Sequence, residues 1–153
     1  MIQFDEYGYV TPYNVVELEM GTFENVFVTN LHRRMLFNEY LAYSESLKKL
    51  DLGNFFQWVD GSFVGRSKDN PDDIDLVNFL DYNVFRSKEK ELNALRDTFP
   101  RIDSYKSPVY PDDHKYYSNF NSERIHWLHF FTRTRPNRHT KKRFHKGVIQ
   151  LNF

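Results

Sequence analysis

The chain has 153 residues, a formal net charge of zero and an aromatic content of 18%. This length suits one domain, and 15 Phe and 10 Tyr residues supply large side chains for a single core. The absence of cysteine excludes disulfides, zinc–thiolate centres and cysteine nucleophiles. No apolar run reaches the roughly 18 residues that a membrane-spanning helix needs, and residues 1–10 lack the basic start and apolar core of a signal peptide. We therefore expect one cytoplasmic domain comprising residues 1–153.

The hydrophobic pattern predicts both helices and strands. An irregular arm with a possible short strand is expected at residues 1–19. Apolar residues then recur at four-residue spacing (Phe23, Phe27 and Leu31), which is typical of an amphipathic helix, and Arg33 belongs to the polar face of that helix. In chain order, we expect helices at residues 23–50, 87–98 and 122–132 and strands at residues 55–59, 74–80, 101–109 and 147–153. These elements predict the α+β class (mixed α/β), with a small, partly mixed sheet and flanking helices.

The central segment carries the most informative pattern in the chain. An apolar strand ends at the turn Gly61-Ser62, a polar loop follows, and the next strand begins with Asp73-Ile74-Asp75. Residues i and i+2 of a strand project to the same face, about 6.6 Å apart. The carboxylates of Asp73 and Asp75 therefore point the same way, beside a turn that a phosphate can approach. This combination suits a divalent metal that holds a nucleoside triphosphate.

On these residues the chain resembles the nucleotidyltransferase-fold superfamily, whose members carry Gly-Ser or Gly-Gly after an apolar strand and Asp-x-Asp on the next strand. Gly61, Ser62, Asp73 and Asp75 match that pattern. The resemblance is strongest to small bacterial members with a GSFV…P-x-D-I-D-L-V core and a closing segment like residues 146–149. It spans nearly the whole chain, although only the central stretch is specific.

The resemblance implies a minimal Mg²⁺-dependent nucleotidyltransferase. Such an enzyme transfers a nucleoside monophosphate from an NTP to a hydroxyl of RNA, a protein or a small molecule, and it uses up to two Mg²⁺ ions. Gly61 would let the backbone approach the triphosphate, and the hydroxyl and amide of Ser62 would donate to it. Lys68 or Arg66 would offset phosphate charge. Similar proteins often occur in toxin–antitoxin or phage-defence settings, so a cognate toxin or antitoxin is an expected partner.

The resemblance also requires a third metal-ligating carboxylate beside Asp73 and Asp75. Asp103 follows Ile102 at the start of a predicted strand, where similar proteins carry such a residue, although Ser104 replaces the usual aliphatic neighbour. The other acidic candidates are Asp97 in a predicted helix and Asp112 and Asp113 in a loop. We therefore take Asp73, Asp75 and Asp103 as the expected catalytic and metal-binding set.

Two less specific interpretations of the central segment remain open. Gly61-Ser62 is also compatible with an ordinary hairpin turn, and Asp73 and Asp75 with a solvent-facing strand edge. In that case the protein is a non-catalytic member that acts by binding a protein partner, as an antitoxin does, or RNA. The acidic loop at residues 69–73 lacks the central Gly and closing Glu of an EF-hand, so a calcium loop is excluded.

The segment 124–146 is strongly basic. It has eight basic residues and no acidic one: Arg124, Arg133, Arg135, Arg138, Lys141, Lys142, Arg143 and Lys146. Together with Trp127, Phe130 and Phe131 it suggests an RNA-binding surface, or else a solvated basic tail that balances an acidic site. Glu123, His126 and His129 share a helix face, but no second Glu-x-x-His copy accompanies them, which favours packing over a di-metal site.

Overall fold

The computed structural model describes residues 1–153 and confirms the predicted mixture of helices and strands. The helices are α1 (Met20–Phe27), α2 (Leu31–Lys48), α3 (Tyr82–Ser87), α4 (Glu89–Thr98) and α5 (Tyr117–Phe131). The strands are β1 (Gln3–Phe4), β2 (Val10–Thr11), β3 (Val15–Glu17), β4 (Phe56–Asp60), β5 (Ile74–Asp81), β6 (Ile102–Val109) and β7 (Val148–Asn152). No helix is long and apolar enough to cross a membrane.

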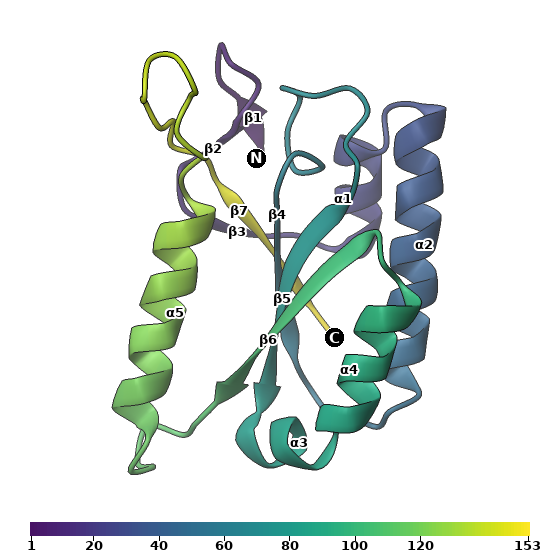
Figure 1. Cartoon of the computed structure of the whole chain (residues 1–153), viewed down its shortest axis with the longest axis vertical. Helices are drawn as coiled ribbons and strands as arrows, with labels where there is room; N and C mark the ends of the chain where they lie inside the picture. Colours follow the sequence, from purple (N-terminus) through teal and green to yellow (C-terminus); the bar gives the residue numbers. More distant parts are fainter.

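Five strands form one mixed sheet in the order β3-β7-β4-β5-β6 (Figure 1). The central strand β4 pairs antiparallel with both β5 and β7, whereas the outer pairs β3–β7 and β5–β6 are parallel. β7 comes last in the sequence yet lies between β3 and β4. β1 and β2 form a separate antiparallel pair in the N-terminal arm. The predicted mixed sheet is therefore confirmed.

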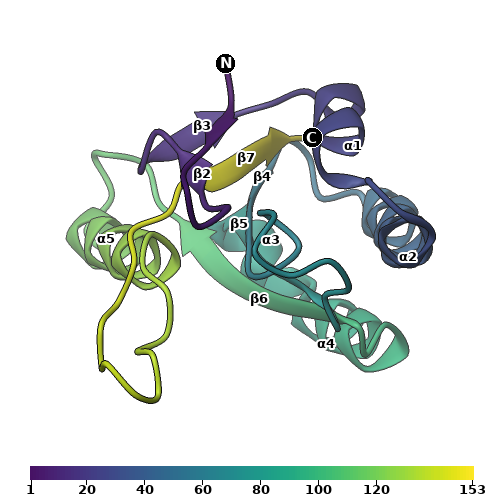
Figure 2. The ribbon, with the colours of Figure 1, turned by 90° about the horizontal axis from the view of Figure 1, so that it is seen from above.

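Helices cover both faces of this sheet, α1, α2 and α4 on one side and α5 on the other (Figure 2). The alternation of side chains along β5 explains the two layers. Leu76 and Leu80 belong to the larger core, which also holds Leu36 of α2. Val77 and Phe79 belong to a smaller core under α5. Because both faces are buried, β5 is an almost continuous apolar run interrupted by polar residues that have specific partners.

The predicted continuous helix at residues 23–50 is wrong. α1 ends at Phe27 and α2 begins at Leu31, where the Asn30 side chain accepts a hydrogen bond of 2.8 Å from the backbone N–H of Arg33. Asn is among the best N-cap residues because it satisfies an otherwise unpaired amide of the first turn. The break turns Leu31 outward, to 85% exposure, and buries Arg33 to 2% exposure. The two residues thus exchange the environments that the sequence pattern predicts.

Two further helix boundaries differ from the prediction. The short helix α3 was not predicted; it starts because Asp81 at the end of β5 accepts hydrogen bonds from the amides of Asn83 and Val84. Helix α5 begins at Tyr117 rather than at residue 122. Its first turn is polar and aromatic, so the hydrophobic period starts only further along the helix.

A buried polar chain fixes the register of β4 against β5. The Tyr40 hydroxyl donates to Gln57 (2.6 Å), the Gln57 amide to Asn78 (2.8 Å), and the Asn78 amide to the Tyr43 hydroxyl (2.8 Å). Gln57 and Asn78 are direct cross-strand partners. A slip by one residue would break this chain and turn every side chain to the opposite face. The same register determines which residues meet at the far end of the two strands.

Candidate functional site

Three carboxylates stand side by side across the sheet. Asp75 at the start of β5 is the register partner of Asp60 at the end of β4 and of Asp103 at the start of β6. Register partners project to the same face, and the alternation along β5 assigns Asp75 to the face covered by α5. Asp73 immediately precedes β5, and it lies near enough for its charge to add to the effect of burial in raising the pKa of Asp75. The sequence-predicted residues Asp73, Asp75 and Asp103 are therefore neighbours in the fold.

Gly61 has both a conformational and a steric reason to be glycine. Its φ of +75° lies in the left-handed region, which residues with a Cβ rarely adopt. A Cβ at this position would also collide with the Oδ2 atom of Asp75 and come within 2.9 Å of its Cγ. The turn after β4 thus packs directly on the carboxylate of the neighbouring strand, so any side chain at position 61 would displace Asp75.

The carboxylates raise one another's pKa. Burial, followed by the charges of Asp73 and Asp103, raises the pKa of Asp75 to about 6. Burial and the charge of Asp103 likewise raise the pKa of Asp73. Lys146 and Arg135 act in the opposite direction on Asp75. Burial and the neighbouring carboxylates thus both oppose ionisation of Asp73 and Asp75, and the nearby basic groups offset this only in part.

A buried ion pair joins this acidic row to the start of β7. Lys146 Nζ lies 2.7 Å from Asp60 Oδ2, and the two side chains are only 11% and 5% exposed. Burial raises the pKa of Asp60 to about 6 even though Lys146 counteracts it, and the Oδ1 atom has no hydrogen-bond partner. The sequence pattern assigns no role to Asp60 and places Lys146 only in the basic segment 124–146. The available signal was their position, immediately before Gly61 and Gly147.

Arg33 holds the loop at residues 62–69, which we call the serine loop. Its guanidinium donates at 2.7–3.3 Å to loop carbonyls, namely those of Ser62, Phe63, Gly65, Lys68 and Asp69. In contrast, no backbone N–H of residues 62–65 donates to a backbone carbonyl. The acceptors of the loop are thus occupied, whereas the amides of residues 62–65 make at most the weak hydrogen bond of the turn at residues 62–63. Successive free amides are the usual backbone contribution to an anion site.

The two predicted phosphate-contacting cations lie in different places. Lys68 lines a cavity with the carboxylates, where its Nζ is 2.6 Å from Asp72 Oδ2. Arg66 lines no cavity that contains the carboxylates, because its guanidinium lies over the ring of Phe4, 4.1 Å from the centroid. The Arg66 amide also donates to the carbonyl of Gly8. Arg66 therefore anchors the serine loop to the N-terminal arm.

Two adjoining cavities meet at the acidic row. The first, of about 420 Å³, has Ser62, Ser67, Lys68 and Asp73 in its wall, and we call it the serine cavity. The second, of about 260 Å³, has Tyr105, Phe130, Arg133 and Arg143 in its wall, and we call it the arginine cavity. Six residues line both, namely Gly61, Asp75, Asp103, Thr134, Arg135 and Lys146. The carboxylates thus form a boundary between two spaces of different character.

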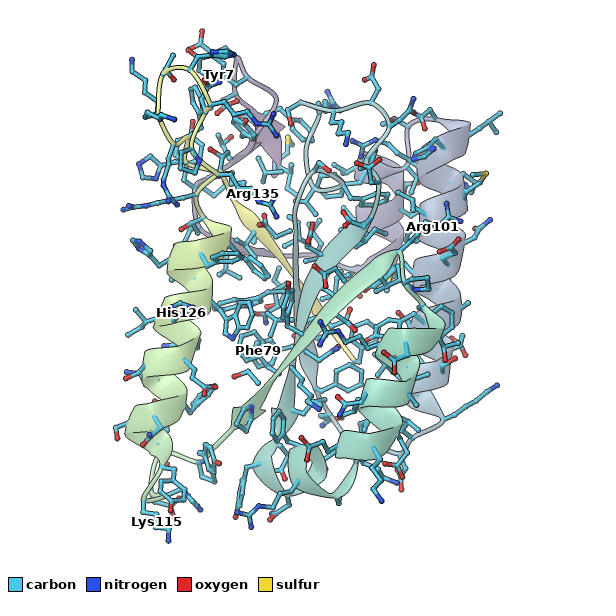
Figure 3. All side chains as sticks on the ribbon, in the orientation of Figure 1. Tyr7, Phe79, Arg101, Lys115, His126 and Arg135 are labelled. Carbon is cyan, nitrogen blue, oxygen red and sulfur yellow. The ribbon has the colours of Figure 1, made fainter.

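A basic hairpin at residues 132–146 forms the other side of both cavities. A bridge between Arg133 and His145 and a hydrogen bond from the amide of Thr134 to Phe144 hold it together. The N-terminal arm supports it, since the Tyr7 ring lies 4.7 Å from that of Phe144. Figure 3 shows Arg135 between this hairpin and the sheet. Half of the predicted basic segment thus lies at the site and the rest elsewhere on the surface.

The remaining predicted candidates lie away from this site. Asp97 is an exposed residue of α4, and Asp112 and Asp113 follow the opposite end of β6. His126 points outward from α5 (Figure 3), and Glu123 accepts a hydrogen bond from Ser107. No three acidic or imidazole side chains in the structure stand together at the spacing of a metal centre.

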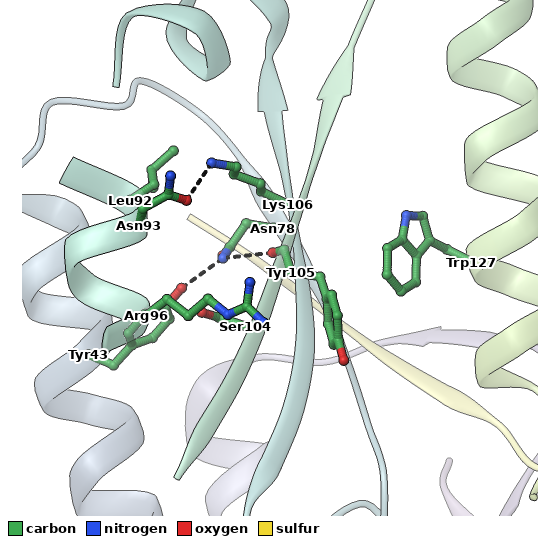
Figure 4. A pocket seen from close by; sticks show the side chains of 9 residues that line it. All are labelled: Tyr43, Asn78, Leu92, Asn93, Arg96, Ser104, Tyr105, Lys106 and Trp127. Atoms are coloured by element: carbon green, nitrogen blue, oxygen red, sulfur yellow. Dashed lines mark hydrogen bonds between the residues drawn. The ribbon is translucent and has the colours of Figure 1, made fainter. Parts of the chain in front are cut away.

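A separate hollow of about 190 Å³ lies further along β6, between α4 and α5 (Figure 4). Its polar groups are paired within the protein: Lys106 donates to Asn93, and Asn78 donates to Tyr43 and to the carbonyl of Tyr105. No carboxylate lines it. Because most of its hydrogen-bonding groups are paired and the guanidinium of Arg96 lies over the ring of Tyr105, we assign it to packing around the edge strand.

The fold and the site define an α+β domain with a carboxylate row at one end of a mixed sheet and a basic hairpin facing it. A family model described as a family of unknown function (DUF6932) matches residues 2–152, so the chain belongs to this family. No curated protein matches the chain. No solved structure matches it either.

Proposed function

We propose that the protein is a Mg²⁺-dependent nucleotidyltransferase that transfers a nucleoside monophosphate from an NTP to a hydroxyl acceptor. One observation carries the proposal. Asp73 and Asp75 lie with Asp103, Gly61 and Ser62, which come from two other segments of the chain, around one cavity that also has a basic wall. An acidic row that faces amides and cations suits a metal–triphosphate complex. The carboxylates would bind the metal, and the amides and cations would bind the triphosphate.

The donor set fits magnesium by its chemistry. Mg²⁺ prefers carboxylate oxygens and completes its coordination with water and substrate phosphate. Asp73, Asp75 and Asp103 would hold it; burial first, and the neighbouring carboxylates second, raise the pKa values of Asp73 and Asp75, and a bound cation would counteract both causes. When bound, Mg²⁺ supplies a Lewis acid that stabilises charge on the phosphoryl oxygens. In the structure the three side chains do not stand at the spacing of a metal centre, so metal binding would require them to move closer together.

The chain's own residues have complementary roles in this reaction. The amides of the serine loop and Lys68 would hold the triphosphate, and Arg33 keeps the carbonyl oxygens of the loop away from it. In the transfer, the acceptor oxygen bonds to the α-phosphorus as the bond to the pyrophosphate oxygen breaks. The hydroxyl proton would pass to a carboxylate that lines both cavities, Asp75 or Asp103, and pyrophosphate would leave. Lys146 and Arg135, which line both cavities, are placed to offset the charge that develops.

Calorimetric titration with Mg²⁺ and each of the four NTPs tests the proposal. We expect at least one NTP to bind only with Mg²⁺, and the Asp73→Ala/Asp75→Ala variant to lose this binding and pyrophosphate release. Asp112→Ala/Asp113→Ala is the matched control, because it removes two exposed carboxylates at the other end of β6. Binding that survives in the Asp73/Asp75 variant would refute the proposed site.

A non-catalytic, partner-binding protein is the rival function. The observation in its favour is that no three acidic side chains stand at metal-ligand spacing. The same titration separates the two functions, because a partner-binding protein has no reason to bind an NTP in a Mg²⁺-dependent manner. If none of the four NTPs binds, the rival becomes the better explanation of the fold.

A further inference from the structure

Apart from the residues that it shares with the serine cavity, the arginine cavity makes no contact in the proposed triphosphate site. It shares Asp75 and Asp103 with the serine cavity but extends from them in another direction, under α5. A transferase needs two substrates to meet at one set of reacting groups. Two cavities that share only their acidic boundary and part of the hairpin fit this requirement.

The lining of the arginine cavity is cationic and aromatic. Arg133, Arg135 and Arg143 are exposed, and none of their guanidinium groups makes an ion pair or a side-chain hydrogen bond within the protein. Phe130 is 58% exposed, a large value for an apolar ring in a cavity wall. Unpaired guanidinium groups next to an exposed ring provide phosphate contacts and a stacking surface, the two elements by which proteins hold single-stranded nucleic acid.

We infer that the arginine cavity binds the acceptor, and that the acceptor is the end of a single-stranded nucleic acid. The inference rests on the proposed function, since only a transferase has an acceptor. The terminal nucleotide would stack on Phe130, and its hydroxyl would face Asp75 and Asp103. Three phosphates of the strand would each contact one guanidinium, namely those of Arg133, Arg135 and Arg143. A cavity of about 260 Å³ is smaller than the roughly 300–1,000 Å³ of drug-sized sites, so it has room for one terminal unit of a longer chain.

Fluorescence anisotropy with a short single-stranded oligoribonucleotide, the matching oligodeoxyribonucleotide and a free mononucleotide tests this inference. Each phosphate contact with a single strand contributes about −0.7 to the slope of log K against log salt. Three arginine contacts predict a slope of about −2, and Arg133→Ala/Arg143→Ala reduces it to about −0.7. A fourfold rise in salt then weakens wild-type binding about 18-fold and variant binding about threefold. The RNA and DNA probes identify which acceptor is preferred.

The control variant is Arg86→Ala/Lys90→Ala, which removes two exposed positive charges from α3 and α4 on the opposite side of the sheet. We expect it to bind the oligonucleotide as the wild type does, and Arg133→Ala/Arg143→Ala to keep Mg²⁺-dependent NTP binding. Unchanged oligonucleotide binding in the arginine variant, loss of its NTP binding, or a preference for the mononucleotide would each overturn the inference. If the wild type binds an NTP but no oligonucleotide, the inference about the acceptor is overturned and the proposed function stays intact. If it binds an oligonucleotide but no NTP, the proposed transferase is refuted and a nucleic-acid site is not.

Discussion

Replacing Asp75 by Asn is expected to stabilise the protein while it abolishes NTP binding. The pKa of Asp75 is raised from 3.8 to about 6 by burial and by Asp73 and Asp103. A shift of about two units corresponds to at most about 3 kcal/mol. Because the Asp75 side chain is only partly buried, solvent screening reduces this to about 1.5 kcal/mol. For a domain of this size we expect the melting temperature to rise by about 3–6 °C.

The stability gained by Asp75→Asn should depend on pH in a defined direction. A carboxyl group whose pKa is higher in the folded state binds its proton more tightly there than in the unfolded chain. The unfolding free energy of the wild type therefore falls as pH rises from about 4 to about 6, because Asp75 ionises in that range. Asp75→Asn has no carboxyl group at this position and keeps that free energy. We expect the melting temperatures of the two proteins to differ at about pH 7.5 and to converge near pH 4.

Thermal denaturation followed by circular dichroism, with and without Mg²⁺, measures both effects. Added Mg²⁺ should raise the melting temperature of the wild type, because it binds the folded state, and should leave Asp75→Asn unchanged. Asp112→Asn is the control, since this carboxylate is exposed and its removal should change little. A variant less stable than the wild type at about pH 7.5, or an equal gain at both pH values, would refute the electrostatic reasoning.

Three further substitutions test the architecture by urea unfolding. Gly61→Ala should abolish NTP binding and lower the unfolding free energy by more than about 1 kcal/mol, because it combines a positive φ with a collision; normal NTP affinity would contradict this. Arg33→Met should cost about 2–4 kcal/mol, since it leaves the serine-loop carbonyls without donors; a loss below about 0.5 kcal/mol would show that the loop is held otherwise. Lys146→Met should lower the unfolding free energy by about 3–5 kcal/mol, because Asp60 remains buried and unpaired. The double variant Asp60→Asn/Lys146→Met should recover most of this loss.

The centre of the site follows from local sequence. The two-residue spacing of Asp73 and Asp75 predicts that their side chains project the same way, and both line the serine cavity although β5 begins only at Ile74. The placement of Asp103 required a resemblance, because its neighbour Asp75 is brought to it by strand pairing and not by sequence proximity. The pairing of Asp60 with Lys146, across 86 positions of the chain, had no local signal beyond two adjacent glycines.

The environment of Arg33 could not be read from periodicity. The spacing of Phe23, Phe27 and Leu31 is consistent with one helix, yet the Asn30 cap interrupts it and rotates the following turn. The carbonyls that accept from Arg33 belong mostly to a loop about 30 residues later in the chain. A helical pattern reports which side of a helix is apolar, and it carries no information about a polar loop that needs donors.

The place of β7 in the sheet has a consequence for when the site forms. β7 inserts between β3 and β4 and carries Lys146 just ahead of it, so its pairings join distant parts of the sequence. Contacts of such large sequence separation form late in folding, because the entropy of loop closure must be overcome first. During synthesis, β4, β5 and β6 leave the ribosome before β7. A nascent chain therefore holds Asp60 before its partner Lys146 is available, and the buried ion pair between them forms only when β7 joins the sheet.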